Sequence, residues 1–298
     1  MRILVTGASG YLGRWVAQRL AAEHEVTGTY LSVDAPIPGC RLERLDMAAP
    51  DTLRELIKRL RPDAVVHTAA MARPDACEKD GKLARVLNVD AVEAAARGAA
   101  EAGARLIYIS TDLVFDGKSP PYKEESPTNP LSFYAKLKLE GERRVRELCP
   151  AGLTLRMALI YGWKMAGTET FTGFMYRSFK SGRKVKLFTD QLRSALYVED
   201  AAEIIARLLA LPGGAEACDG VLHMAGPQTI SRLRFGELFC RIFGLDRNLI
   251  EPTRVADMPL SARRPLDCTL DGSRLFRALN FTPRTVEQAF LDMLSKVP

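Results

Sequence analysis

The sequence predicts an α/β fold of the doubly wound type, in which helices cover both faces of a parallel sheet. Short, almost unbroken apolar runs alternate with amphipathic segments over the first half of the chain, and three glycines follow the first run. The composition is that of a globular protein, with 298 residues of which 47% are hydrophobic and 26% charged. A chain of this length can bury a large core and carry a second, smaller domain.

The expected elements follow one another as strands and helices. Residues 2–7 (RILVTG) form an apolar run that ends at glycine, and residues 11–23 place Leu12, Val16 and Leu20 on one helical face. Further strands are expected at residues 24–30, 41–46, 64–70 and 105–110, and further helices at 51–60 and 86–103. Asp51 is expected to cap the helix that it begins, and Gly103 to end the longer helix.

After about residue 160 the alternation becomes irregular, and an aromatic segment follows at residues 171–179 (FTGFMYRSF). Residues 194–210 and 220–226 have the pattern of strand and helix units that return to the main sheet. The domains expected from these patterns are a main, nucleotide-binding domain of residues 1–160 and about 186–225, and a smaller substrate domain of about 161–185 and 226–298.

The composition also narrows the classes of function. The net charge of +6 comes from arginines scattered beside acids, so we expect no nucleic acid partner, and a basic lining for a phosphorylated small substrate explains the charge equally well. No apolar run is long enough for a membrane span and the start lacks a signal peptide pattern, which favours a cytoplasmic protein. Six cysteines without CxxC and three histidines without ligand spacing predict reduced thiols and no metal site.

The segment TGASGYLG places Gly7, Gly10 and Gly13 between the first strand and the first helix. Glycines at this spacing permit a tight turn, let the backbone approach a pyrophosphate and let the helix pack closely on the strand. The pattern therefore predicts a dinucleotide site of the Rossmann type, which Tyr11 and Leu12 in the same turn also line.

The second strand ends in Tyr30, Leu31 and Ser32, where an acid for the adenosine 2′-hydroxyl would be expected. Arg14 directly follows the third glycine and is a candidate to bind a 2′-phosphate. Ser32, at the end of the second strand, is a further candidate cofactor contact. The alternative for Arg14 is an arginine that is simply solvated. We therefore expect NADPH as the cofactor, with NADH as the alternative.

The segment SFYAKLKLEGERR places Tyr134 and Lys138 four residues apart, which puts both on one face of a helix. A nearby ammonium group favours the phenolate, so the pair can act as an acid/base unit. The strand of residues 105–110 ends in Ser110 and Thr111, at the edge where doubly wound sheets bind their ligands. A hydroxyl, a phenol and a lysine are thus expected to meet at one place.

Together with RRPLDCTLD, these motifs resemble the extended short-chain dehydrogenase/reductases, and within them the dTDP-4-dehydrorhamnose reductase group of dTDP-rhamnose biosynthesis. The resemblance implies hydride transfer from a nicotinamide nucleotide to the ketone of a nucleotide-linked 4-keto-6-deoxysugar. Tyr134 would be the general acid, Lys138 would hold the nicotinamide ribose and lower the pKa of the phenol, and Thr111 would bind the substrate oxygen.

The same resemblance assigns further residues. Cofactor contacts are implied for Asp46, Met47, Ala69 and Ala70, and a supporting role for Asn88; Asp75 and Glu78 in RPDACE match a family signature without an assigned role. Arg193 is the candidate for the diphosphate of the substrate, with a surface ion pair as the alternative.

Two positions depart from the pattern of the group. Leu113 stands where an aromatic residue often follows Ser-Thr-Asp, and Leu159 stands where tryptophan is frequent. Both positions face the expected substrate, and an aliphatic side chain offers neither a phenol's hydrogen bond nor a flat stacking face. The sugar is therefore expected to differ from dehydrorhamnose.

Two alternatives stay open. The segments RPDACE, LNVDA, LIYIS, VFDG, PPYKEE and LRMALIYG also resemble the regulatory beta subunit of methionine adenosyltransferase. This resemblance would make the chain a nicotinamide-nucleotide-binding module that does not act mainly as an enzyme. Epimerisation or dehydration of a nucleotide sugar, with bound NAD cycling within one turnover, is the other. A homodimer is compatible with the sequence, which does not determine the oligomeric state.

Overall fold

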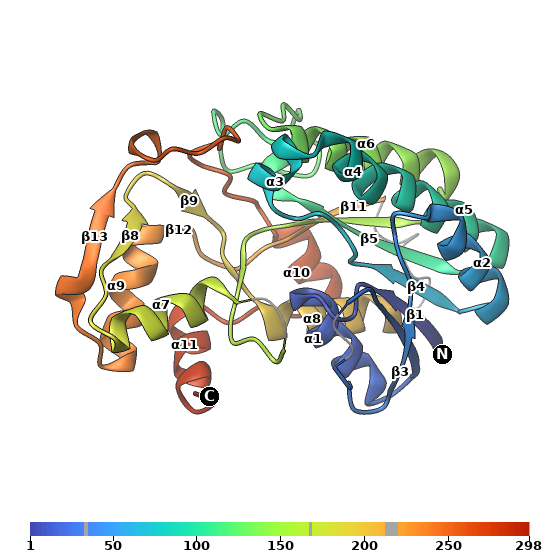
Figure 1. Ribbon diagram of the computed structural model, residues 1–298, viewed down its shortest axis with the longest axis horizontal. Coiled ribbons are helices and arrows are strands. Elements are labelled where there is room, and N and C mark those ends of the chain that lie inside the picture. Colours follow the sequence, from blue (N-terminus) through green and yellow to red (C-terminus); the bar gives the residue numbers. More distant parts are fainter. Residues whose placement is uncertain (33–34, 167–168, 212–219, 298) are drawn as a thin grey trace.

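The computed structural model describes residues 1–32, 35–166, 169–211 and 220–297. Within these residues, a seven-stranded sheet in the order β3-β2-β1-β4-β5-β6-β11 forms the centre of the larger lobe, and all its strands are parallel (Figure 1). The predicted doubly wound fold is confirmed. The strands are β1 (Arg2–Thr6), β2 (Glu25–Tyr30), β3 (Cys40–Arg44), β4 (Ala64–His67), β5 (Arg105–Thr111), β6 (Leu153–Met157) and β11 (Val221–Met224).

Helices cover both faces of this sheet (Figure 1). Side chains alternate between the faces of a strand, so Ile3 and Val5 of β1 join the core on one face while Leu4 joins the core on the other. The first face carries α1 (Tyr11–Ala21), α8 (Val198–Ala210) and α10 (Ser273–Leu279). The second carries α2 (Pro50–Leu60), α5 (Ala91–Ala102) and α6 (Phe133–Leu148), with the short helices α3 (Pro74–Lys79) and α4 (Gly81–Arg85) beside α6.

A smaller lobe lies beyond the carboxyl ends of the strands. Its elements are α7 (Phe171–Lys180), α9 (Arg232–Phe243), α11 (Val286–Leu294), the parallel pair β8 (Val185–Phe188) and β13 (Ile250–Thr253), and the antiparallel pair β9 (Leu192–Arg193) and β12 (Ile230–Ser231). Phe235, Phe239 and Phe290 pack edge to face in its interior, with ring centroids 4.8 to 5.2 Å apart. This aromatic core is continuous with the core under α1 and α8.

Two local expectations are wrong, and a third holds with a different type of helix in its first turn. Ala49 precedes the helix α2 and Pro50 is its first residue, so Asp51 lies inside the first turn and does not cap the helix. The expected helix at 86–103 begins with a π-helical turn, Val86–Asp90, before α5 continues to Ala102. The strand β10 (Leu196–Tyr197) does not join the main sheet but pairs with β7 (Ile160–Tyr161), because β11 occupies the place beside β6.

Other expectations hold. The chain returns to the main sheet through β11, and Gly103 ends α5 with a positive φ of 65°. The division into two domains stays a prediction. The described cysteines are free thiols, while Cys218 lies outside the described residues.

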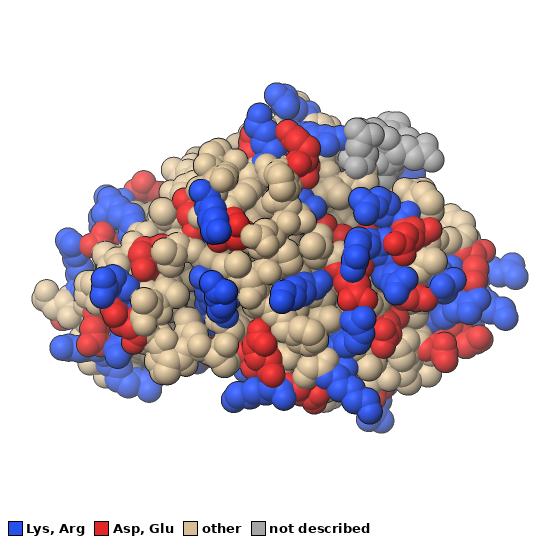
Figure 2. Space-filling model, turned by 90° about the horizontal axis from the view of Figure 1, so that it is seen from above, with Lys and Arg blue, Asp and Glu red and all other residues tan. Residues whose placement is uncertain are grey.

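The charged side chains are mixed on the face that Figure 2 shows, where Lys and Arg alternate with Asp and Glu. In the part of the chain that the structure describes, no helix is both long and apolar enough to span a membrane.

Candidate active site

Two neighbouring cavities lie at the carboxyl ends of the main strands. The larger, of about 450 Å³, is bounded by α6, the ends of β5 and β6 and residues of the smaller lobe. The smaller, of about 250 Å³, lies over the ends of β1, β2 and β4. Gly10, Thr68 and Ala70 line both, so the two cavities adjoin. This is the edge at which doubly wound sheets bind ligands.

The glycine turn forms the floor between the cavities. Gly7 has a positive φ of 68°, a conformation that favours glycine. A Cβ atom on Gly13 would lie 2.2 Å from the carbonyl oxygen of Gly7, so only glycine lets α1 start this close to the turn. These observations agree with the reasons for which the spacing predicted a dinucleotide site.

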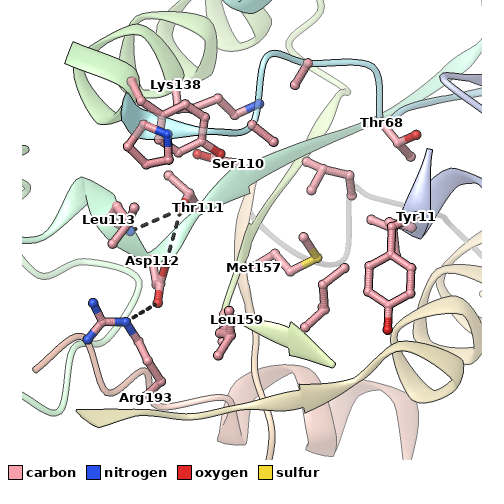
Figure 3. Close-up of a pocket in the computed structure, with 18 of the residues that line it drawn as sticks. Tyr11, Thr68, Ser110, Thr111, Asp112, Leu113, Lys138, Met157, Leu159 and Arg193 are labelled. Carbon is pink, nitrogen blue, oxygen red and sulfur yellow. Dashed lines mark hydrogen bonds and ion pairs between the residues drawn. The ribbon is translucent and has the colours of Figure 1, made fainter. Parts of the chain in front are cut away.

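Most of the predicted cofactor contacts line one cavity or the other. Tyr11, Leu12 and Gly13 line the larger cavity, and the smaller is lined by Gly7, Asp46, Met47 and Ala69 among others. Tyr11 stands on the far side of the larger cavity from Thr111 (Figure 3), and its buried hydroxyl has no hydrogen-bond partner. The residues present thus fit a dinucleotide, with a glycine floor and an unsatisfied polar atom.

Arg14 and Ser32 line neither cavity in the described part of the chain. The Arg14 side chain is buried, and its guanidinium donates to the carbonyl oxygens of Ala35, at 2.9 Å, and Pro36. Two of the guanidinium nitrogens are thus engaged by the chain itself, while the buried Nε has no partner.

Tyr134 and Lys138 lie on the buried face of α6, as their spacing predicted. The hydroxyl of Ser132 accepts a hydrogen bond from the backbone N–H of Ala135 and caps the helix. Ser132, the extended residue two positions before Tyr134, thereby fixes the start of the helix, and the side chains of Tyr134 and Lys138 enter the larger cavity. Figure 3 shows Lys138 above Ser110, with Thr111 pointing into the same space.

Burial dominates the electrostatics of this pair. It raises the pKa of Tyr134 above its ordinary value, an effect that the charge of Asp112 increases and a hydrogen bond with Thr111 opposes. Burial also lowers the pKa of Lys138 to about 7, while Glu142 acts in the opposite direction. Loss of water is the largest effect on the phenol, so the net shift of its pKa is upward, and the role of Lys138 in lowering it stays a prediction.

A network of side chains supports Lys138 from behind. Its ammonium group lies 4.3 Å from the ring centroid of Tyr108. One turn further along α6, Glu142 accepts a hydrogen bond from Ser110 at 2.5 Å and forms a buried ion pair with Arg156 at 2.9 Å. The face of α6 that carries Tyr134 and Lys138 is therefore fixed against β5 and β6.

Thr111 is linked to the smaller lobe through Asp112. The Thr111 hydroxyl donates to Asp112 at 3.2 Å, and the Nε atom of Arg193 lies 3.3 Å from the other oxygen of that carboxylate (Figure 3). Arg193 also donates to the carbonyl oxygens of Pro265 and Leu266. Arg193 therefore forms an ion pair, which was the alternative predicted for this residue, but the pair is buried and not at the surface.

Two further arginines line the larger cavity and were not predicted. The guanidinium of Arg232 lies 4.7 Å from the ring centroid of Phe171, and its buried Nη1 has no partner. Arg264 has a buried Nε without a partner. Burial and the neighbouring charges of Arg193 and Arg264 lower the pKa of Arg232 to about 9. This wall of the cavity can receive an anion.

Leu113 and Leu159 line the same cavity, where the departures from the group pattern placed them. The lining of the cavity thus combines these aliphatic side chains with the arginines of the later segments. Such a combination suits a ligand with a weakly polar reacting end and an anionic end.

Sequence reasoning missed Asp112, Arg232 and Arg264. Asp112 lies within the motif ISTDLVFDG and Arg264 within RRPLDCTLD, so both had a signal that pointed to the site but not to a role. Arg232 begins α9 after an unremarkable stretch of sequence, and no pattern singles it out.

The chain is similar to two kinds of characterised relative. It is 34% identical over 277 residues to methionine adenosyltransferase 2 subunit beta from Xenopus tropicalis, covering 92% of this chain and 81% of that one. It is 32% identical over 292 residues to a probable low-salt glycan biosynthesis reductase from Haloferax volcanii, covering 96% and 95%.

Solved structures give the same picture. The fold matches a dTDP-4-dehydrorhamnose reductase from Clostridium acetobutylicum with a TM-score of 0.85 and 26% identity, covering 100% of this chain and 99% of that one. It also matches the enzyme of that name from Bacillus anthracis, solved in complex with NADP, with a TM-score of 0.83, 24% identity and 99% coverage of both chains.

The family model described as the RmlD substrate binding domain matches residues 1–298. The resemblance that the motifs predicted is confirmed, and the chain belongs to this family.

Proposed function

We propose that the protein is an NAD(P)H-dependent reductase that acts on the ketone of a nucleotide-linked deoxysugar, with a 4-keto-6-deoxysugar as the first candidate. One observation carries this proposal: Thr111, Tyr134 and Lys138 line a cavity that adjoins the cavity over the glycine turn. The reductases among the relatives support it.

The chemistry follows from the positions of these side chains. A nicotinamide nucleotide supplies hydride when it is bound over the glycine turn. Tyr134 donates its phenolic proton to the carbonyl oxygen of the substrate, and its raised pKa keeps that proton in place at neutral pH. The Thr111 hydroxyl hydrogen-bonds the same oxygen in exchange for Asp112. Lys138, whose charge favours the phenolate left behind, would hold the nicotinamide ribose.

The basic wall of the cavity supports a nucleotide-linked substrate. Arg232 and Arg264 each keep a buried nitrogen without a partner, and guanidinium groups bind phosphate oxygens well. Arg193, the predicted diphosphate ligand, is already held by Asp112 and two carbonyl groups. We therefore assign the diphosphate to Arg232 and Arg264.

The test is the loss of NADPH absorbance with a panel of nucleotide-linked 4-keto-6-deoxysugars, beginning with dTDP-4-dehydrorhamnose. In Tyr134→Phe the rate should fall by about 10²-fold or more, as expected when a general acid is removed. The affinity for NADPH should change little, because the phenol contributes its proton and little of the binding surface. Unchanged turnover in this variant would refute the assignment of Tyr134.

A second function is favoured by one specific observation, the 34% identity to methionine adenosyltransferase 2 subunit beta. In this case the protein would bind the nicotinamide nucleotide and act on a partner enzyme. Tight NADPH binding without turnover of any ketosugar, together with an enzyme that purifies with the chain, would favour this function over the reductase.

Three narrower predictions accompany the proposal. The chain acts in the cytoplasm, in keeping with the free thiols of its described cysteines. A homodimer is compatible with the sequence, and sedimentation of the purified protein tests it. Its chain divides into a main domain of residues 1–160 and about 186–225 and a smaller, substrate-binding domain of about 161–185 and 226–298.

A further inference from the structure

The segment RPDACE connects the two walls of the larger cavity. Asp75, in the first turn of α3, accepts hydrogen bonds from the Ser261 hydroxyl and the Ala262 backbone N–H, both at 2.9 Å, and from the guanidinium of Arg264. Residues 261–264 belong to the connection between β13 and α10, which passes along the upper edge of the view in Figure 1, and their hydrogen bonds to Asp75 bring it to α3. A single carboxylate thus receives three donors from the other lobe.

The same short helix also contacts the catalytic helix. Glu78 accepts a hydrogen bond at 2.9 Å from the backbone N–H of Phe133, the first residue of α6. Asp75 and Glu78 lie three residues apart, so α3 places the segment that carries Arg264 in a defined position relative to Tyr134.

Arg264 needs such a contact because the neighbouring charges repel it. Arg232 and Arg193 lie at the same wall, and one carboxylate, Asp112, faces them from the larger lobe. Asp75 provides the opposite charge for Arg264. Burial alone would raise the pKa of Asp75, but the hydrogen bonds from Ala262 and Ser261 and the charge of Arg264 outweigh this effect and lower it. Asp75 therefore stays ionised at neutral pH.

We propose that Asp75 is a positioning residue that holds Arg264 at the cavity against the repulsion of Arg232, so that two guanidinium groups stand ready for the diphosphate of the substrate. The inference rests on the proposed function, because it concerns the anionic end of the same ligand. A preassembled pair of cations binds without the cost of ordering a long side chain at the moment of binding.

The experiment compares Asp75→Asn with the unchanged full-length protein. The KM for the nucleotide-linked ketosugar should rise about tenfold, the loss expected for one charge-assisted contact, while kcat falls less than about threefold. The affinity for NADPH should stay the same. Asp80→Asn is the matched control, because it makes the same charge change just after α3. Among the residues that the structure describes, the Asp80 side chain accepts only from the backbone N–H of Leu83, and the amide oxygen of asparagine can do the same.

A double variant separates positioning from general damage. Arg264→Gln alone should raise KM by at least as much as Asp75→Asn, and the combination of the two should raise it no further, because Asp75 acts through Arg264. Additive effects, or an unchanged KM in Asp75→Asn, would overturn the inference. Thermal melting shows whether each variant is folded, and if Asp75→Asn is not, Ser261→Ala must raise KM for the inference to stand.

Binding of dTDP and UDP to the NADPH-loaded protein, measured by calorimetry, distinguishes this inference from the proposed function. If the protein turns over no ketosugar but binds either nucleotide less tightly in both single variants, the proposed reductase fails and the role of Asp75 stands. Equal binding in the variants and the unchanged protein, or no binding at all, overturns the role of Asp75.

Discussion

Lys138 is the residue that sets the pH range of the proposed reaction. Its pKa is lowered to about 7 by burial, so the ammonium is charged below this pH and neutral above it. The charge stabilises the phenolate that forms when Tyr134 gives up its proton. We therefore expect kcat to fall as the pH rises through about 7, and steady-state rates at saturating substrate and NADPH check this.

The affinity for NADPH, measured at each pH, is the control for this prediction. If the fall in kcat reflected loss of cofactor, higher NADPH concentrations would restore it. A rate that stays flat well above pH 7 would show that the charge of Lys138 does not matter for proton donation.

Single residues also show which parts of the site the sequence can predict. The positions of Tyr134 and Lys138 follow from helical geometry alone, and the glycine turn from its spacing, because both depend on neighbours within a few residues. The ion pair between Asp112 and Arg193 joins distant parts of the chain, so it depends on how the lobes meet. Arg14 shows the same limit, since its partners belong to a loop whose path local patterns do not determine.

At the scale of elements, α6 is held to the sheet by a buried ion pair. Glu142 and Arg156 are each 7% exposed, and Glu142 also accepts from Ser110. In Glu142→Gln the charge of Arg156 stays buried without its counterion. The free energy of unfolding should fall by about 3 kcal/mol, within the range found when one partner of a buried pair is removed. Urea unfolding measures this loss.

A double replacement provides the control. Changing Glu142 and Arg156 together to leucine removes both charges, so it should recover much of the stability lost in Glu142→Gln. A double variant that is less stable than the single one would mean that the ion pair itself, and not the avoidance of an unpaired charge, holds α6.

Helices and strands were predicted well where a single local pattern determines them, and poorly where contacts with distant segments determine their type or position. The strands of the main sheet follow from apolar runs. The π-helical turn at Val86–Asp90 does not follow from a local pattern. It contains Asn88, whose buried side chain donates a hydrogen bond to the carbonyl oxygen of Met71 in another segment of the chain. The predicted position of β10 in the main sheet was wrong for a similar reason, because no local pattern determines which strand pairs with β6.

At the scale of the whole molecule, Arg284 ties the C-terminal helix to the larger lobe. It contacts Asp200 of α8 at 2.8 Å and Asp292 of α11 at 3.0 Å, and lies over the ring of Tyr197. Asp200 is almost fully buried. In Arg284→Met its carboxylate loses its counterion, so the free energy of unfolding should fall by about 3 kcal/mol at pH 7.

The loss should depend on pH in a defined direction. Burial already raises the pKa of Asp200, and removal of the guanidinium raises it further. The folded variant therefore takes up a proton at a higher pH than the unfolded chain, and a neutral carboxyl costs less to bury. Arg284→Met should lie closer to the unchanged protein at acidic pH than at pH 7, and a loss that grows on acidification would contradict this.

The two ends of the larger cavity come from separate stretches of chain. The glycine turn, Thr111 and the face of α6 all lie before residue 150, whereas Arg193, Arg232 and Arg264 lie on short segments after residue 190. Descendants of one ancestral gene could therefore exchange a few residues in the later segments and accept another nucleotide diphosphate, while the residues proposed for the reduction stayed unchanged. The same division gives protein engineers a place to begin: grafted short segments around these arginines should alter the choice of substrate without rebuilding the catalytic helix.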